Sequence, residues 1–573
     1  MNKPSTKMIT HLRYEDLFNS VEKGNLILPL SYLDDEKNID TLINDIIQNF
    51  DPVEATSYSS FLNMLCQSVG SGELLEINKK ELLLTGLTKK IPDNKLLFHR
   101  DNLLYFVAQI IEQNVDGDMH ITGECNSQNS QKYYKALLLI NSKINKEADG
   151  DKDYAVMKML IREYPYYYDP QLIDEICLKR ICRYKYIYNE LLNSLPPKDE
   201  KRIYEGIKAI EQEMGISLKD YFYVLEGLFN WFVHMPVAKN TAPNQKIRNS
   251  SLGFNYNNLN SFYIDKAKFR NDEKFLKLIE GLSKGLPALR SYFKGKERKD
   301  KIDNYYKCFQ NFFDYPIFKL NGKQFCIIDL KFLIEGICSG FLWKIPAERK
   351  DIEDAYGLLM EEYFEFLLKK IFQSINITRA ENNRPDAIIE HQGYLIIFEF
   401  TTEYYRIASL YNTDTSSFKE DLHRLLFNIG KNDPMARGKK QKGKFIKLND
   451  YIEQEKNKNK KIIPILVTEN ALGDFDLLNK FDNFLEDKIK SNALMNLQYN
   501  KPFIINLDDL EIFWAMSVEN AAETDFIDCI ESWEKAKAEK GPFHYNFSYF
   551  IANKKNGVVR NTKYREFFGF TND

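Results

Sequence analysis

Two short apolar segments in the C-terminal half, residues 384–391 (RPDAIIEH) and 394–401 (YLIIFEFT), are separated only by Gln392 and Gly393. Branched and aromatic residues of this kind favour β-strands, and a two-residue connection that ends in glycine is typical of a β-hairpin. So short a loop fixes the register of the strands, because facing residues must have numbers that add up to 785, as the two loop residues do. The sequence therefore predicts an antiparallel strand pair of known register.

This register brings two carboxylates face to face. Ile388 is expected opposite Ile397, which places Asp386 opposite Glu399 with Cβ atoms about 4.5–5.5 Å apart. Facing carboxylates repel each other unless a positive group lies between them, and a hard cation such as Mg²⁺ or Mn²⁺ binds oxygen ligands of this kind. The alternative is an exposed hairpin edge at which both acids meet water. The strongly apolar residues around them favour the cation site.

Further elements are expected around the hairpin. Apolar residues at helical spacing predict helices over 351–372 and 416–429, and apolar runs predict a short strand within 374–383, a strand over 461–469 and a strand followed by a helix over 501–517. Pro464 indicates that its strand is an edge strand or contains a bulge. Asp508, Asp509 and Glu511 are expected to cap the helix that follows the last strand.

The hairpin sequence resembles a known family. Pro385-Asp386, followed by Glu399-Phe400-Thr401, is similar to the signature of the PD-(D/E)XK nuclease superfamily, and the resemblance covers about 350–515. It implies a restriction-endonuclease-like mixed β-sheet flanked by helices. With a mainly helical N-terminal half, the fold class expected for the whole chain is α+β/α/β.

The resemblance also implies a set of metal ligands for one or two Mg²⁺ (or Mn²⁺) ions. The set is Glu361, Asp386, Glu399 and the main-chain carbonyl of Phe400. Glu361 is included because the pattern Gly357-Leu-Leu-Met-Glu361-x-Tyr363 resembles the helix that adds a ligand in this superfamily. Glu362 and Glu365 are the alternatives on the same helix.

Thr401 stands where the superfamily usually has lysine, although some restriction and nicking endonucleases of the superfamily show a Glu-x-Thr form. Another group must then orient the attacking water and offset charge at the phosphate. Arg384 lies opposite Thr401 in the predicted register, and Lys419 begins the next helix. The expected catalytic residues are thus Asp386, Glu399, Thr401, Arg384 and Lys419.

A basic segment, residues 431–447 (KNDPMARGKKQKGKFIK), follows this region and is predicted to be a flexible loop. The whole chain has 79 Lys and Arg against 82 Asp and Glu, so any site for a polyanion has to be a local patch. The expected contacts to nucleic-acid phosphates are Arg437, Lys439, Lys440, Lys442 and Lys444. The alternative is a loop that only adds solubility.

Four segments are expected in the domain organisation: a helical recognition or regulatory domain (1–235), a polar linker with helices and a β-hairpin (236–348), the nuclease-like domain (349–520), and a C-terminal helix with a basic-aromatic tail (521–573). The helical periodicity in the first segment is clearest over 39–50, 101–114, 131–144 and 217–233. Asn321-Gly322 marks the expected hairpin in the second segment.

Other classes of protein lose support. Eight cysteines without a C-x-x-C motif do not form a zinc site, and reduced thiols suit a cytoplasmic protein. No apolar run approaches the roughly 20 residues that span a bilayer, and the N-terminus lacks the apolar region of a signal peptide, so no membrane partner is expected.

The function expected from the resemblance is metal-dependent endonuclease activity in restriction or anti-phage defence. DNA is favoured over RNA as the substrate, and a homodimer is implied because superfamily members often pair their catalytic domains to cut two strands. Two alternatives stay open: an inactive nuclease-fold scaffold that binds nucleic acid or a protein, and a helical adaptor whose nuclease-like segment serves assembly. The adaptor would bind no divalent metal.

Overall fold

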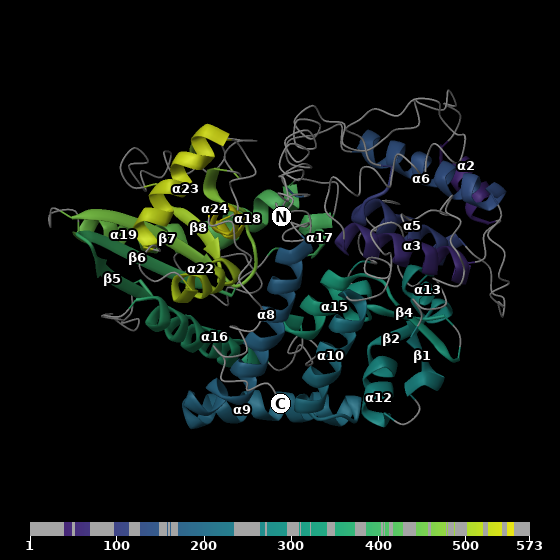
Figure 1. Cartoon of the computed structure of the whole chain (residues 1–573), viewed down its shortest axis with the longest axis horizontal. Coiled ribbons are helices and arrows are strands. Elements are labelled where there is room, and N and C mark those ends of the chain that lie inside the picture. The colour runs from purple at the N-terminus through teal and green to yellow at the C-terminus, as the bar shows by residue number, and fades with distance from the viewer. Residues whose placement is uncertain are drawn as a thin grey trace, which may run out of the picture. The chain divides into compact units, whose positions relative to one another are not determined.

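The computed structural model in Figure 1 is mostly helical and contains two small sheets. It describes residues 39–48, 52–68, 97–113, 127–147, 158, 161, 170–233, 264–269, 272–294, 309, 311–320, 322–340, 350–372, 385–402, 405, 407–411, 416–427, 443–455, 460–476, 478, 486–487, 501–519, 525–540 and 547–554. Within these ranges, no helix combines the length and the apolar character that crossing a membrane requires.

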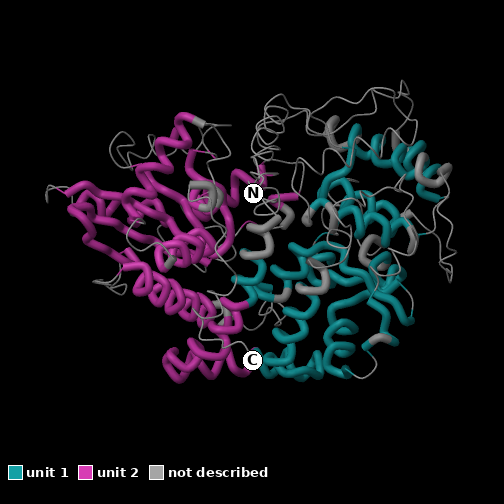
Figure 2. The backbone as a smooth tube through the Cα atoms, in the orientation of Figure 1, with its two compact units in different colours: residues 1–152, 165–181, 207–345 teal, residues 153–164, 182–206, 346–573 magenta. Residues whose placement is uncertain are grey.

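The chain divides into two compact units, each made of several chain segments (Figure 2). Unit 1 comprises residues 1–152, 165–181 and 207–345, and unit 2 comprises residues 153–164, 182–206 and 346–573. Helices α8 (Pro170–Asn189) and α9 (Pro197–Met214) each contribute residues to both units. The segment 236–348, expected as a separate domain, thus falls within unit 1 except for its last three residues. The segment 521–573, also expected as separate, falls within unit 2.

Unit 1 combines helices with a four-stranded sheet of order β1-β4-β3-β2. Its elements are α2 (Ile39–Ile47), α3 (Pro52–Ser68), α5 (Arg100–Gln113), α6 (Ser127–Glu147), α10 (Leu218–Val233), β1 (Ile264–Asp265), η4 (Lys266–Phe269), α12 (Glu273–Gly281), β2 (Ser283–Gly285), α13 (Leu286–Lys294), β3 (Ile317–Lys319), β4 (Gln324–Ile327) and α15 (Leu330–Ile337). The four helices expected from periodicity are present with small differences at their ends. The β3–β4 hairpin is confirmed, whereas its partners β1 and β2 carried no clear signal because they have only two and three residues.

A buried ion pair lies at the centre of unit 1. Arg100 on α5 donates from Nε to Asp329 at 2.7 Å, and both side chains are almost inaccessible to solvent. Asp329 also accepts from the main-chain N–H of Phe332, which makes it the N-cap of α15. The carboxylate of Asp329 is required as the N-cap at the start of α15, and the charge of Arg100 compensates it.

Unit 2 contains the sheet that carries the hairpin. Its strands follow the order β5-β6-β7-β8, with β5 antiparallel to β6 and the other neighbours parallel. The elements are η3 (Leu191–Ser194), α16 (Lys350–Ile371), β5 (Ala387–His391), β6 (Tyr394–Thr401), α17 (Ile407–Tyr411), α18 (Ser416–Leu426), α19 (Lys444–Glu455), β7 (Lys461–Thr468), β8 (Phe503–Asn506), α22 (Leu507–Glu519), α23 (Phe526–Lys540) and α24 (Phe547–Lys554).

The predicted hairpin register is confirmed, because Ile388 pairs with Ile397 and Ala387 pairs with Phe398. Gln392 and Gly393 both have positive φ, 49° and 81°, as a tight hairpin turn of the favoured hand requires. The expected helices and strands over 351–372, 416–429, 461–469 and 501–517 are also present, and the strand expected within 374–383 lies outside the described residues.

The expectation from Pro464 was wrong, because β7 is an interior strand between β6 and β8. The structure also explains how proline is accommodated there. Pro464 pairs with Ile397 of β6, whereas the pairing of β7 with β8 begins one residue later, at Ile465. At Pro464 the strand therefore still has one unpaired side, and the missing N–H costs no ladder hydrogen bond there.

Helices cover both faces of this sheet. Successive residues of a strand point to opposite faces, so each strand contributes side chains to both sides. Residues Leu395, Ile397, Leu466 and Ile504 belong to a buried cluster with residues of α18 and α19. On the opposite face, the Phe400 ring stacks on Phe364 of α16, with ring centres 4.9 Å apart. Phe503 packs against Trp533 of α23 on that face. Glu399 is two residues from Ile397 in β6, so its side chain points to the same face of the sheet, the one covered by α19.

Two described glycines of unit 2, Gly393 and Gly357, lack neighbours near an added Cβ and provide a test of the turn. We expect Gly393→Ala to lower the free energy of unfolding by about 1 kcal/mol, because an L-residue is strained at positive φ. We expect Gly357→Ala, within α16, to raise it by about 0.5–1 kcal/mol, because alanine favours the helix. Urea unfolding of both variants measures the contrast, and changes of the same sign would contradict the turn geometry.

Candidate active site

The hairpin places two carboxylates at the point where β5 begins. Asp386 directly precedes β5, and its Oδ2 accepts a hydrogen bond of 2.6 Å from the main-chain N–H of Phe400 on β6. Glu399 lies within β6 and its side chain is completely buried, whereas that of Asp386 is 14% exposed. The exposed-edge alternative does not describe Glu399, whose charge has to be compensated within the protein.

Two lysines on α19 compensate it. Lys444 Nζ lies 3.0 Å from Glu399 Oε1, and Lys447 Nζ lies 2.9 Å from the same oxygen. The residues are three apart, so both point to one side of the helix. Lys444 also donates to the main-chain oxygen of Phe400 and lies 3.9 Å from Asp386 Oδ2. Its ammonium group therefore contacts three oxygen-bearing residues of the hairpin.

A glycine fixes where these lysines begin. Gly443 immediately precedes α19, and its N–H donates to the main-chain oxygen of Phe427, at the end of α18, at 3.2 Å. A Cβ on Gly443 would lie 2.2 Å from the carbonyl carbon of Phe427, so no other residue fits without moving the backbone. This close approach sets the position of Lys444 relative to the hairpin.

The electrostatics of the cluster follow from burial and neighbouring charge. Burial raises the pKa of Glu399, and the charge of Asp386 adds to this effect, whereas Lys444 and Lys447 oppose it. Burial alone would lower the pKa of Lys444, but the attraction of Glu399 and Asp386 outweighs it and raises this pKa. The carboxylates and the ammonium groups thus stabilise one another's charged forms.

Glu361 belongs to the same electrostatic cluster. It lies on α16, and its side chain is exposed in part. Desolvation by neighbouring atoms and then the charge of Asp386 raise its pKa, while Lys444 and Lys447 lower it. Of the two alternatives on this helix, Glu365 pairs instead with Lys369 at 2.5 Å, one turn along.

The oxygen atoms around Lys444 match what a hard cation requires. Asp386 and Glu399 supply carboxylate oxygens, Phe400 supplies a main-chain carbonyl, and oxygen ligands of this type suit Mg²⁺. Glu399 Oε2 is buried and receives no hydrogen bond from any described residue, which leaves one acceptor open. Among the described residues, no three His, Cys, Asp or Glu side chains are grouped closely enough to form a ready-made metal site.

The other expected site residues are distributed as follows. Thr401 is buried at the end of β6, and its main-chain oxygen accepts a hydrogen bond of 3.0 Å from Glu469 N–H. Lys419 is half-buried on α18, and the ion-pair partners found for Asp386 and Glu399 are on α19 instead. Residues Arg384, Arg437, Lys439, Lys440 and Lys442 lie outside the described residues.

Sequence reasoning assigned Lys444 to a flexible basic loop and gave Lys447 no role. In the structure Lys444 is the first residue of α19 and both lysines contact Glu399. A signal was present, since lysines three apart, with apolar residues between and after them, predict one charged side of a helix.

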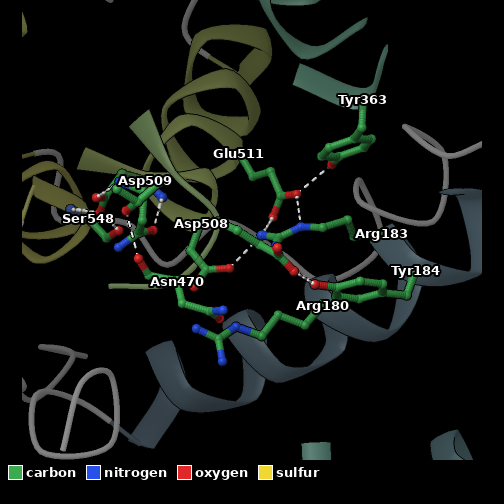
Figure 3. A network of polar contacts seen from close by, with 12 residues as sticks. Arg180, Arg183, Tyr184, Tyr363, Asn470, Asp508, Asp509, Glu511 and Ser548 are labelled. Carbon is green, nitrogen blue, oxygen red and sulfur yellow. Dashed lines mark hydrogen bonds and ion pairs between the residues drawn. The ribbon is translucent and has the colours of Figure 1, made fainter. Parts of the chain in front are cut away.

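A second buried network holds α16, the helix of Glu361, within unit 2 (Figure 3). Arg183 donates to Asp508 at 2.5 Å and to Glu511 at 2.6 Å. Tyr363 of α16 donates to the same Glu511 oxygen at 2.5 Å. Burial disfavours the charge of Arg183, but Glu511 and Asp508 outweigh it and raise its pKa. The network thus links residues 182–206 with α16 and α22.

A neighbouring carboxylate completes the network. Glu469, which follows β7, accepts hydrogen bonds from Tyr356 of α16 at 2.6 Å and from Tyr184 of α8. Burial and then the charge of Glu469 raise the pKa of both phenols, so they remain protonated donors. A second point of α16 is thereby fixed to the end of the sheet.

The expectation that Asp508, Asp509 and Glu511 all cap α22 was correct for Asp509 alone. Asp509 accepts from Asn506 N–H at 2.8 Å, and Asn506 Oδ1 accepts from Asp509 N–H at 3.1 Å, which is a capping box. Asp508 and Glu511 bind Arg183 instead. Nothing local in the sequence indicates this, because the partners are more than 300 residues apart.

Comparison of the chain with protein-family models, with curated proteins and with solved structures found no match. The chemistry assigned to the cluster of Asp386, Glu399, Lys444 and Lys447 therefore rests on its geometry and on the sequence pattern. We refer to these four residues below as the carboxylate–lysine cluster.

We expect Arg183→Met to lower the free energy of unfolding of unit 2 by about 3–5 kcal/mol, because Asp508 and Glu511 would remain buried without their counter-charge. The matched control is Lys369→Met, which breaks an exposed pair on α16 and should cost less than about 0.5 kcal/mol. Urea unfolding followed by tryptophan fluorescence measures both. A similar small loss in both variants would show that the network does not hold α16.

Burial raises the pKa of Asp509 from 3.8 to about 6, so the folded protein keeps this proton to higher pH than the unfolded chain. Its contribution to stability is full below pH 3.8 and is lost as the pH rises to about 6. Asp509→Asn lacks this loss. The difference in free energy of unfolding, variant minus wild type, should therefore rise by roughly 1–3 kcal/mol when the pH is raised from 4 to 7. A constant difference in denaturation experiments would contradict the assignment.

Proposed function

We propose that unit 2 is a metal-dependent phosphodiesterase of restriction-endonuclease-like fold that hydrolyses nucleic acid, with DNA favoured over RNA. The single observation that carries the proposal is the buried Glu399, which faces Asp386 across the hairpin and contacts two lysine ammonium groups. Buried carboxylates beside lysines are costly to maintain, and ionisable groups in such environments are concentrated at functional sites.

Asp386, Glu399 and the Phe400 carbonyl would hold Mg²⁺ or Mn²⁺, with Glu361 close enough to contribute to the local charge. The metal ion would polarise the scissile phosphate and lower the pKa of a bound water. Lys444 and Lys447 would offset the negative charge that develops on the phosphate oxygens. In this proposal Lys444 takes the role that the usual motif lysine has at the position of Thr401.

The remaining parts of the proposal rest on the same resemblance. Unit 1 would recognise the substrate or regulate cleavage, and the basic residues Arg437, Lys439, Lys440 and Lys442 would contact phosphates near the cluster. A role in restriction or anti-phage defence and a homodimeric state are proposed by analogy with the superfamily.

A second candidate function is an inactive scaffold that binds nucleic acid or a protein. One specific observation favours it: Lys444 and Lys447 already compensate the charge of Glu399, so the hairpin is stable without a metal ion. The scaffold and the enzyme differ in whether the chain cuts nucleic acid and whether it binds a divalent ion at Asp386.

The test is cleavage of labelled duplex DNA, single-stranded DNA and RNA by the full chain with Mg²⁺, Mn²⁺ or EDTA. We expect cutting that requires metal and that falls about 100-fold or more in Asp386→Asn and in Glu399→Gln, because each substitution removes a carboxylate charge from the proposed metal site. The matched control is Glu390→Gln, an exposed carboxylate on the same hairpin that forms a surface ion pair with Lys460, which should cut like the wild type.

Circular dichroism of each variant separates loss of activity from loss of fold. Metal-independent cutting, or cutting unaffected by Asp386→Asn and Glu399→Gln, would refute the proposed site. Absence of cutting on all three substrates, together with absence of Mn²⁺ binding, would favour the scaffold.

A further inference from the structure

The ammonium group of Lys444 lies among the oxygen atoms proposed as metal ligands. It is 3.0 Å from Glu399 Oε1, donates to the Phe400 carbonyl and lies 3.9 Å from Asp386 Oδ2. Desolvation and the charge of Asp386 raise the pKa of Glu361, and the charge of Lys444 opposes this rise. Three residues of the expected ligand set thus lie beside one lysine, and the fourth feels its charge.

Lys447 differs from Lys444 in this respect. Its Nζ lies 2.9 Å from Glu399 Oε1, as close as that of Lys444, and it is on the same helix. Lys444 also contacts the Phe400 carbonyl and Asp386 Oδ2, whereas within the described part of the chain the carboxylate that Lys447 contacts is Glu399. The two lysines carry the same charge and share one oxygen, but only Lys444 is placed between the ligands.

An ammonium group and a divalent ion that share these oxygen atoms repel each other strongly at such distances, so the two compete for the site in the absence of further negative charge. Helix α19 begins at the close contact of Gly443 with Phe427, so a movement of the whole helix would break this contact. The lysine side chain is different, since its four-carbon stem carries several rotatable bonds. Metal entry would therefore require rotation of the Lys444 side chain.

We propose that Lys444 is a built-in counter-ion that occupies the cation position of the metal-free protein and that a divalent ion displaces it. This inference rests on the proposed function and adds a form of regulation to the same site. The displaced ammonium group then needs a new anionic partner, and a phosphodiester at the site supplies one. Metal binding alone is consequently weak, and nucleic acid strengthens it by giving Lys444 another position.

The test is titration of MnCl₂ into the metal-free full chain by calorimetry, without nucleic acid. We expect Lys444→Met to bind Mn²⁺ roughly tenfold or more tightly than the wild type, because the competing charge is removed. The matched control is Lys447→Met, which removes an equal charge from the same Glu399 oxygen and should tighten binding by a smaller factor. Lys444→Gln serves as a second variant, because it keeps a donor for the Phe400 carbonyl without the charge.

The outcomes separate the inference from the function on which it rests. Equal or weaker Mn²⁺ binding in both Lys444 variants, beside wild-type binding that Asp386→Asn abolishes, would overturn the inference and leave the metal site in place. Equal tightening in Lys444→Met and Lys447→Met would also overturn it, because general charge removal would then explain the gain. Absence of Mn²⁺ binding in the wild type and in every variant would overturn the metal site and the inference together.

Discussion

The compensation of one buried carboxylate is the constraint around which unit 2 is arranged. Glu399 lies on an interior strand with its side chain completely buried, where an unpaired charge would be prohibitively costly. Its compensation requires α19 to lie against that face of the sheet, with lysines one turn apart. The sharp approach of Gly443 to Phe427 follows from this requirement, because it starts α19 at the right residue. The glycine immediately before α19 is thus explained by the need to compensate the charge of Glu399 on β6.

The same physical solution recurs away from the cluster. Arg183 compensates Asp508 and Glu511 in unit 2, and Arg100 compensates Asp329 in unit 1. In both cases arginine supplies several donors in a fixed geometry, which suits a site without solvent. The carboxylate–lysine cluster differs, since each lysine carries a single mobile ammonium group. The rigid guanidinium of arginine suits the two networks described above, and the flexible lysine stem suits the cluster in which the proposed chemistry requires a group that can move.

The sequence predicted the register and the turn of the hairpin of unit 2, because a two-residue loop leaves a single register and the apolar pattern is strong, whereas β5 begins three residues later than expected. It also predicted that Asp386 and Glu399 face each other. It could not predict that Lys444 and Lys447 reach Glu399, because that contact depends on how α19 packs on the sheet. The ion pairs of Arg183 with Asp508 and Glu511 could not be predicted either, because the partners are more than 300 residues apart. Strands β1 and β2 have only two and three residues, which is too few for a recognisable pattern. The restriction-endonuclease-like topology remains a prediction.

Unit 2 takes one of its buried side chains, Arg183, from the segment 182–206, which precedes residues 207–345 of unit 1 in the chain. During synthesis this arginine leaves the ribosome more than 300 residues before Asp508 and Glu511. Contacts of such high sequence separation form late, and the unit cannot close until nearly the whole chain has emerged. A fragment that starts at residue 346 would therefore contain the hairpin and both lysines, yet would bury two acids without the arginine that binds them both.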